Sequence, residues 1–116
     1  MYKAKSVHQA VNEYFRLIPA GDLAAVVGLF ANDAVVIPSP LPPTGPVKGL
    51  DAITDLYKGM IGGAPIFKEL RMYDDGSTCV AEIRAEVGQD RRTLEAVDIF
   101  DLNPAGKISR MSVYKR

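Results

Sequence analysis

Three polar side chains in this sequence could act together on one small molecule. Tyr14, Tyr57 and Asp98 each fall within an otherwise apolar pattern. A carboxyl group in apolar surroundings loses the hydration of its charged form, so its pKa rises and the neutral acid can donate a hydrogen bond. A phenol can donate another to the same oxygen, and two such donors stabilise an enolate-like oxyanion where water is excluded. We therefore expect Tyr14 and Asp98 to be donors, with Tyr57 holding and polarising Tyr14.

A purely structural interpretation of each residue stays open at this point. A tyrosine on an apolar helix stripe can be a core ring whose hydroxyl reaches the surface, since tyrosines are commonly only partly buried. Asp98 alternates with Leu94, Ala96 and Phe100 in "LEAVDIF", which places it on the apolar face of a strand. A slip of one residue would turn Asp98 to solvent instead.

Helical spacing predicts two helices before residue 31. The first covers roughly 5 to 18, carries Tyr14 on its inner stripe, and is expected to end at Pro19 and Gly21. Asp22 is expected to cap the second helix. The inward residues of that helix are predicted to be Leu23, Val26, Val27 and Phe30.

The middle of the chain is predicted to hold a turn, a short strand, a loop and a helix. "ANDA" reads as the turn and "AVVI" (34–37) as the strand. The segment 38–46 has five prolines in nine residues, so it is expected to be a stiff loop. A third helix over roughly 49 to 61 carries Tyr57 on its inner side.

From residue 66 the pattern has a period of two, which is typical of strands. The predicted strands are 66–74, 78–87, 91–102 and 107–115. Helices followed by an antiparallel meander predict a single α+β domain over 1–116, with helices packed on one face of a curved sheet.

Composition excludes several classes of function. Fourteen basic and fourteen acidic residues cancel, so there is no electrostatic reason to expect a nucleic acid or a membrane as partner. The sequence has no apolar run of membrane-spanning length and no signal-peptide pattern at its start. With Cys79 as the one cysteine and His8 as the one histidine, neither an internal disulfide nor a cysteine or histidine metal site is expected. The sequence thus predicts a cytoplasmic domain without metal or cofactor.

Four stretches resemble the bacterial ketosteroid isomerases, within the NTF2-like and SnoaL-like superfamily. They are "VNEYF", "AGDLAAVVGLFANDA", "ITDLYKGM" and "VDIFDLNPAGKISRM". The resemblance implies a cone, in which a strongly curved, mostly antiparallel mixed sheet wraps around three helices. It implies that Tyr14 and Asp98 are the two oxyanion-hole donors and that Tyr57 supports Tyr14. In that family the carboxylic acid is kept neutral at pH 7.

The same resemblance implies a pocket for a small hydrophobic ligand, steroid-like or polyketide-like, and a homodimer formed through the outer sheet face. Phe30 and Met111 match pocket-lining positions. Ala81 and Ile83 are expected to line the pocket as well, because they alternate with Glu82 on their strand.

One departure from the family's pattern concerns the catalytic base. The family has a carboxylate at the end of the first short strand, beside the pocket, where this chain has Pro38 in "AVVIPSP", so Pro38 is expected to line the pocket too. We therefore expect a Δ5-3-ketosteroid isomerase-like protein whose activity is weak or altered. Two alternatives stay open: a SnoaL-like cyclase with Asp98 as its acid–base group, and a binding protein for a planar hydrophobic ligand without turnover. A neutral Asp98 would favour a donor role, and an ionised Asp98 a base.

Overall fold

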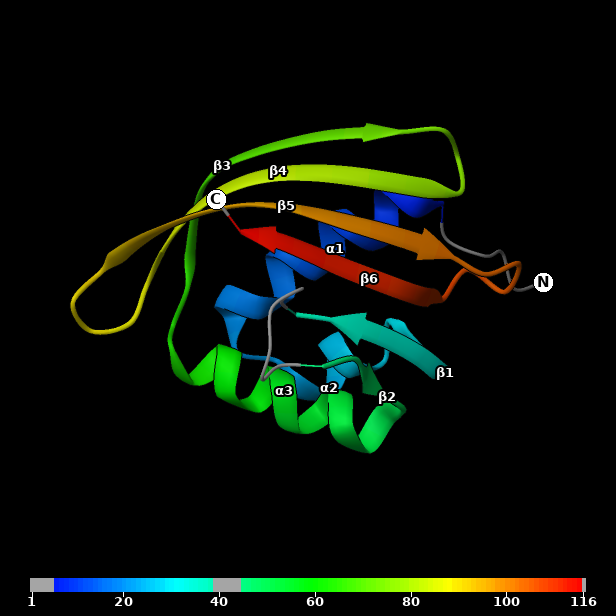
Figure 1. Ribbon diagram of the computed structural model, residues 1–116, viewed down its shortest axis with the longest axis horizontal. Coiled ribbons are helices and arrows are strands. Elements are labelled where there is room, and N and C mark those ends of the chain that lie inside the picture. Colours follow the sequence, from blue (N-terminus) through cyan, green and yellow to red (C-terminus); the bar gives the residue numbers. More distant parts are fainter. Residues whose placement is uncertain (1–5, 39–44, 116) are drawn as a thin grey trace.

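The computed structural model describes residues 6–38 and 45–115. In this part of the chain, three helices pack against one six-stranded sheet (Figure 1). The elements in chain order are α1 (Val7–Ala20), α2 (Leu23–Val27), β1 (Phe30–Ile37), β2 (Val47–Lys48), α3 (Leu50–Gly62), β3 (Ile66–Asp74), β4 (Thr78–Val87), β5 (Arg92–Leu102) and β6 (Ile108–Lys115). The expected α+β architecture with helices before a meander is confirmed.

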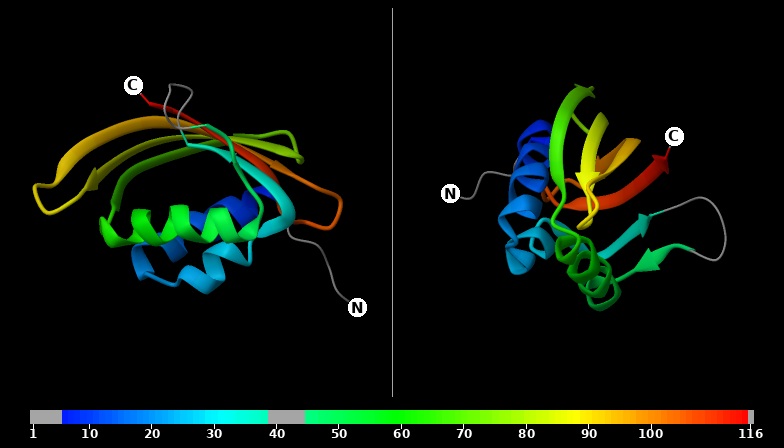
Figure 2. Two further views of the ribbon diagram at one scale, coloured as in Figure 1. Left: turned by 60° about the horizontal axis from the view of Figure 1, so that its bottom comes forward. Right: turned by 90° about the vertical axis from the view of Figure 1, so that its left-hand side faces the viewer.

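The sheet is mixed and has the order β2-β1-β6-β5-β4-β3. Neighbouring strands are antiparallel except for β1 and β6, which pair in parallel. The long strands β3 to β6 curve over the helices, as the two views of Figure 2 show. One face of the sheet is thereby covered by α1 and α3, and the other face points outward.

Local sequence explains where α1 begins and ends. Ser6 and Gln9 form a capping box, in which each side chain accepts a hydrogen bond from the other residue's backbone N–H. Gly21 ends the helix in the left-handed conformation, with φ 75°, which glycine adopts without steric cost. Pro19 was expected outside the helix but lies in its last turn, where its side chain is exposed.

The expectations for residues 30 to 34 are wrong. Phe30 begins β1 and pairs in parallel with Ile108, so it is not part of the second helix. That helix is only five residues long, and Gly28 is its C-cap. The stretch 31–34 is strand rather than turn, and a shift in the β1–β6 register accommodates its turn-forming residues. Pairing with β6 on both sides of this stretch, at Phe30 and from Val35 onward, keeps the chain extended despite the local turn signals.

The predicted strands of the second half are confirmed to within one residue at their starts. β3 and β4 have the expected bounds, and β5 and β6 begin at Arg92 and Ile108. The short strand β2 was not predicted, and the tip of the proline-rich loop, 39–44, lies outside the described residues. Asp22 caps α2 as expected, since its carboxylate accepts from the Ala25 N–H.

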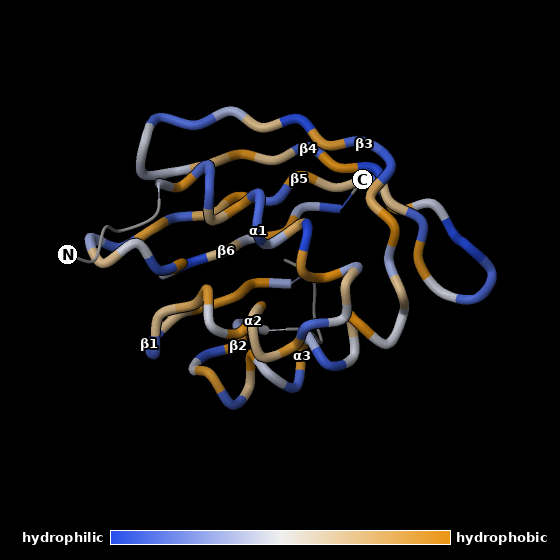
Figure 3. The backbone as a smooth tube through the Cα atoms, turned by 180° about the vertical axis from the view of Figure 1, so that it is seen from behind, coloured by the Kyte–Doolittle hydropathy of each residue, from blue (hydrophilic) through white to orange (hydrophobic). Residues whose placement is uncertain are grey.

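The core lies between the helices and the inner sheet face. Apolar residues along the helices and central strands face this layer, whereas turns such as the β4–β5 connection are hydrophilic (Figure 3). Within the described residues, we find no helix whose length and apolar character would let it cross a membrane.

Candidate active site

Two tyrosine hydroxyls meet inside the core. The hydroxyl oxygens of Tyr14, on α1, and Tyr57, on α3, lie 2.7 Å apart, and the two side chains are 1% and 0% exposed. Both residues belong to the apolar stripes of their helices, which face the same layer because the helices pack on one face of the sheet. The interpretation of each tyrosine as a ring with its hydroxyl at the surface is therefore wrong.

The hydroxyl of Tyr57 has a second partner. It donates a hydrogen bond to the thioether Sδ of Met111, on β6, at 3.1 Å. Met111 is buried and lies opposite Phe100 in the β5–β6 pairing. Three elements that are far apart in sequence, α1, α3 and β6, thus contribute to one chain of polar contacts.

Aromatic rings enclose the tyrosine pair. The ring of Tyr14 makes edge-to-face contacts with Phe15, Phe30 and Phe100, with centroid distances of 4.9, 6.5 and 5.0 Å. Tyr57 contacts the ring of Phe30 as well, at 5.5 Å. Such pairs favour rigid ring positions and exclude water from the hydroxyl groups.

Asp98 lies on the inner sheet face among apolar neighbours. Its cross-strand partners are Ala81 on β4 and Val113 on β6, and Ala96 and Phe100 flank it on the same face of β5. The side chain is 3% exposed, and within the described residues its Oδ1 atom has no hydrogen-bond partner. The observed register of β5 therefore excludes the one-residue slip that would turn Asp98 to solvent.

Burial without a partner changes the acidity of this carboxyl. Loss of hydration raises the pKa of Asp98 to about 7. At neutral pH the group therefore exists in both protonation states, so it can act as a proton donor and as a proton acceptor. This property fits acid–base chemistry near pH 7.

The tyrosines and Asp98 influence one another electrostatically. Burial, the Tyr57 hydroxyl and the charge of Asp98 together hold the pKa of Tyr14 well above its ordinary value. Burial likewise raises the pKa of Tyr57, and the charge of Asp98 adds to that effect. Both phenols therefore stay protonated and are able to donate hydrogen bonds at neutral pH.

The residues expected to line the pocket divide into two groups. Phe30, Ala81, Ile83 and Met111 are all buried in the same core cluster as the tyrosines. Pro38 is half-buried and directly follows the last residue of β1. The contacts of Phe15 and Phe100 with Tyr14 were not foreseen, although the alternation of Phe100 with Asp98 already placed both on one strand face.

A surface groove lies apart from this cluster. A groove of about 710 Å³ runs over the outer face of β3 to β6. Tyr14, Tyr57 and Asp98 are absent from its lining, which is mostly charged. We place the candidate chemistry at the buried cluster of Tyr14, Tyr57 and Asp98, because there a carboxyl whose pKa burial raises occurs together with two buried hydroxyl donors.

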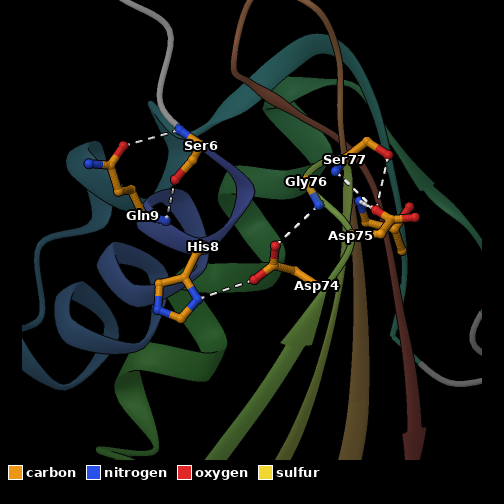
Figure 4. A network of polar contacts seen from close by, with 8 residues as sticks. Ser6, His8, Gln9, Asp74, Asp75, Gly76 and Ser77 are labelled. Carbon is orange, nitrogen blue, oxygen red and sulfur yellow. Dashed lines mark hydrogen bonds and ion pairs between the residues drawn. The ribbon is translucent and has the colours of Figure 1, made fainter.

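His8 takes part in a separate surface contact. Its Nδ1 lies 3.4 Å from Oδ2 of Asp74, which connects the start of α1 to the β3–β4 turn (Figure 4). In that turn the Asp75 carboxylate accepts hydrogen bonds from the backbone of Ser77 and Thr78, which lower its pKa. This network stabilises a turn and does not reach the tyrosine pair.

A SnoaL-like domain model matches residues 11–111, which is most of the chain. The chain belongs to the SnoaL-like family. A search of curated protein sequences gave no significant match. The matched range includes Tyr14, Tyr57, Asp98 and Met111.

Solved structures confirm an NTF2-like fold. The epoxide hydrolase/cyclase-like enzyme SalBIII, which has a role in pyran ring formation in the polyether salinomycin, superposes with a TM-score of 0.79 at 26% identity, covering 94% of this chain and 89% of its own. A candidate polyketide cyclase from Xanthomonas campestris pv. campestris gives 0.79 at 18% identity over 94% and 89%. A candidate isomerase from Bacillus subtilis gives 0.78 at 18% over 93% and 84%. These similarities establish the fold; they do not single out the ketosteroid isomerases among the proteins that share it.

Proposed function

We propose that this SnoaL-like protein is an acid–base enzyme for a small hydrophobic carbonyl compound, with Asp98 as its proton-transfer group. The observation that carries the proposal is the buried Asp98 carboxyl, which has an unpartnered oxygen and lies near two protonated phenols. The 26% identical SalBIII, described as cyclase-like, supports ring-forming or ring-opening chemistry on a polyketide-like molecule.

The proton transfer would proceed at the carbon next to the carbonyl. The Asp98 carboxylate takes the proton, the electron pair of the C–H bond forms a C=C bond, and the carbonyl electron pair moves to oxygen. Tyr14 donates a hydrogen bond to this oxygen, and Tyr57 supports Tyr14. The neutral Asp98 then returns its proton to a carbon or to a leaving oxygen.

We choose Asp98 as the base because of where the other carboxylates lie. Among the described residues, Asp98 is the one acidic residue that is buried. Glu82, on the same strand as Ala81 and Ile83, is exposed on the opposite sheet face, and Asp51 is exposed at the start of α3. One carboxyl must therefore serve as both acid and base, which a pKa near the working pH permits.

A deuterium-exchange experiment tests this function. 2-Tetralone, a planar hydrophobic ketone, is incubated in D₂O with the protein, and loss of its C1 proton signal is followed by NMR. We expect acceleration that rises with pD through about 7 and a loss of roughly 10²-fold or more in Asp98→Asn. Asp101→Asn is the matched control on the same strand, since Asp101 accepts from the Thr78 hydroxyl away from the cluster. Binding of 2-tetralone without faster exchange would favour the non-catalytic binding protein.

Steroid Δ-isomerase activity is the second candidate. It is favoured by the joint presence of Tyr14, Tyr57 and Asp98, with Asp98 as a neutral donor. This function needs another base, because Pro38 occupies the position where the resembling family has its carboxylate.

We also propose a homodimer formed through the outer sheet face. The large exposed apolar side chains, Ile66, Tyr73 and Tyr114, all lie there. The groove is lined by three acidic residues (Glu69, Glu82 and Glu95) and three basic residues (Arg71, Arg84 and Lys115), so its charges can complement a second copy of themselves. A cytoplasmic location remains a prediction from sequence.

A further inference from the structure

The hydroxyl of Tyr57 is placed between two partners but has only one proton. The thioether sulfur of Met111 can only accept, so the 3.1 Å contact uses the Tyr57 proton. The 2.7 Å contact with Tyr14 must then use the Tyr14 proton, with Tyr57 as acceptor. In this arrangement the hydrogen bonds run from Tyr14 through Tyr57 to Met111, and Tyr14 can offer only lone pairs to a ligand.

A carbonyl or enolate oxygen requires the opposite direction. Tyr14 can donate to such a ligand only if Tyr57 turns its proton from Met111 toward Tyr14. This reversal keeps the Tyr14–Tyr57 hydrogen bond and exchanges the bond to sulfur for a bond to the ligand. Because a thioether is a weak acceptor, little is lost when the proton turns away from it.

We propose that Met111 is a positioning residue that sets the direction of the Tyr14–Tyr57 hydrogen bonds and thereby lets one site bind both donor and acceptor oxygens. When the Tyr57 hydroxyl donates to sulfur, the Tyr14 oxygen accepts a hydrogen bond from a hydroxyl ligand. When the Tyr57 hydroxyl donates to Tyr14 instead, the Tyr14 hydroxyl donates to a carbonyl or an oxyanion. The inference rests on the proposed function, because it concerns the oxygen of the ligand that Tyr14 binds.

Met111 is suited to this role by its position. It is 1% exposed on β6, and its neighbour across the strand pair is Phe100, which also contacts the ring of Tyr14. Water therefore cannot easily replace sulfur as the acceptor. If the sulfur is removed, a Tyr57 proton that faces apolar atoms is unpaired, which is unfavourable in a buried site. The Tyr57 hydroxyl can then donate its hydrogen bond only to Tyr14.

The test uses 2-naphthol, whose neutral and ionised forms absorb at different wavelengths. The neutral form can donate to Tyr14, and the naphtholate must accept from it. In Met111→Leu, we expect the ratio of bound naphtholate to bound naphthol at a given pH to rise by at least about threefold, the value of a modest hydrogen bond. In a Tyr57→Phe background, Met111→Leu should leave the ratio unchanged, because the connection to Tyr14 is absent.

Met72→Leu is the matched control. It makes the same substitution at a partly buried methionine that packs against the core from β3. A purely structural role of Met111 would weaken binding of both forms alike and leave their ratio unchanged. That result in a folded Met111→Leu variant, or an equal ratio change in Met72→Leu, would overturn the proposal.

A second measurement needs no ligand, so it separates this inference from the proposed function. In protein labelled with ¹³C at the methionine methyl groups, the Met111 signal is identified by its loss in Met111→Leu. Tyr57→Phe should shift this signal, whereas Tyr14→Phe should shift it much less, because both changes keep the rings and only the first removes the donor to sulfur. If Tyr57→Phe leaves the Met111 signal in place, the inference fails even where 2-naphthol binds. If 2-naphthol does not bind but the signal shifts, the direction-setting contact stands and the proposed function fails.

Discussion

The hydroxyl groups of Tyr14 and Tyr57 lie 2.7 Å apart in the core, although 43 residues separate them in the sequence. This contact determines to which atoms each hydroxyl group can donate a hydrogen bond. Because burial keeps both phenols protonated at neutral pH, the pair has two protons to distribute among Met111, each other and a ligand. The pair is thus a source of hydrogen bonds whose direction can change without movement of the rings.

Tyr14→Phe should weaken binding of 2-naphthol on the order of 1–3 kcal/mol, because the buried ligand oxygen loses its hydrogen-bond partner. Isothermal titration calorimetry at one pH gives the comparison. The control is Tyr114→Phe, since Tyr114 is about half exposed on the outer sheet face. Equal affinities of wild type and Tyr14→Phe would contradict placement of the ligand oxygen at Tyr14.

Asp98→Asn should change how stability depends on pH. The pKa of Asp98 is raised in the folded state from 3.8 to about 7, so between these values the folded protein binds more protons than the unfolded chain. Stability therefore falls as pH rises through this window, by on the order of a few kcal/mol in total. Asparagine does not titrate, so the free energy of unfolding of Asp98→Asn should lack this decrease with rising pH.

Urea unfolding of both proteins at pH values from 4 to 8 measures this difference. The free energy of unfolding of wild type relative to Asp98→Asn should be highest near pH 4 and decrease toward pH 8. Parallel curves would show that the carboxyl of Asp98 has an ordinary pKa, and the acid–base role would then lose its physical basis.

Pro38→Asp tests the isomerase alternative. If the base was lost at this position, the new carboxylate should raise isomerisation of a β,γ-unsaturated 3-ketosteroid by at least about tenfold, a small part of what general-base catalysis supplies. Absorbance of the conjugated enone follows the reaction. Asp98→Ala in that background should reverse most of the gain, because base and oxyanion donor act on the same transition state.

The matched control for that experiment is Pro46→Asp, which changes an exposed proline beside β2. A folded Pro38→Asp protein that binds 2-naphthol and shows no gain would exclude the lost-base hypothesis. The cyclase-like interpretation would then be the remaining enzymatic one.

Two glycine-to-alanine substitutions should have opposite effects on stability. Gly21 has φ 75°, so alanine there is strained and should lower the free energy of unfolding by about 1 kcal/mol. Gly59 lies within α3 with no atom near an added Cβ, so alanine should raise it by up to about 1 kcal/mol. Thermal unfolding followed by circular dichroism compares the two. A destabilised Gly59→Ala variant would mean that the added methyl group meets a neighbouring atom at this helix position.

Tyr114→Glu should dissociate the proposed homodimer, because it introduces a negative charge beside Glu82 and Glu95 in the outer groove. Sedimentation velocity at micromolar concentration should show a dimer for wild type and a monomer for this variant. Ala52→Glu adds the same charge on the exposed side of α3 and should remain dimeric. A monomeric wild type would exclude the interface.

Periodicity alone predicted the architecture of this chain well where one pattern persists. The strands from Ile66 onward mostly alternate because one face is buried, and their bounds were correct within one residue at their starts. The placement of Asp98 followed from the same alternation. Phe30 was misassigned because its helical spacing to Val26 is real, but pairing with β6 decides its conformation.

The finer geometry of the site could not be predicted from the residues. Helical stripes indicated that Tyr14 and Tyr57 face the same layer, yet their contact depends on the packing of α1 against α3 and the sheet. The resemblance indicated Met111 as a lining residue. Nothing in the sequence pattern distinguishes a methionine that lines a pocket from one whose sulfur accepts a hydrogen bond.

The parallel pairing of β1 with β6 has a consequence for how the protein assembles. β6 is the last described strand, yet it lies between β1 and β5 in the sheet and supplies Met111. Until β6 has paired with β5, the β1–β2 pair cannot be added to the sheet formed by β3, β4 and β5. The Tyr57 hydroxyl also lacks its sulfur partner until then. Because joining β1 to β6 closes a loop over most of the chain, it carries a large entropic cost and should be a slow, late step of folding. A ribosome-bound chain would therefore hold its helices and hairpins before it acquires the site, which becomes complete only as the sheet is joined.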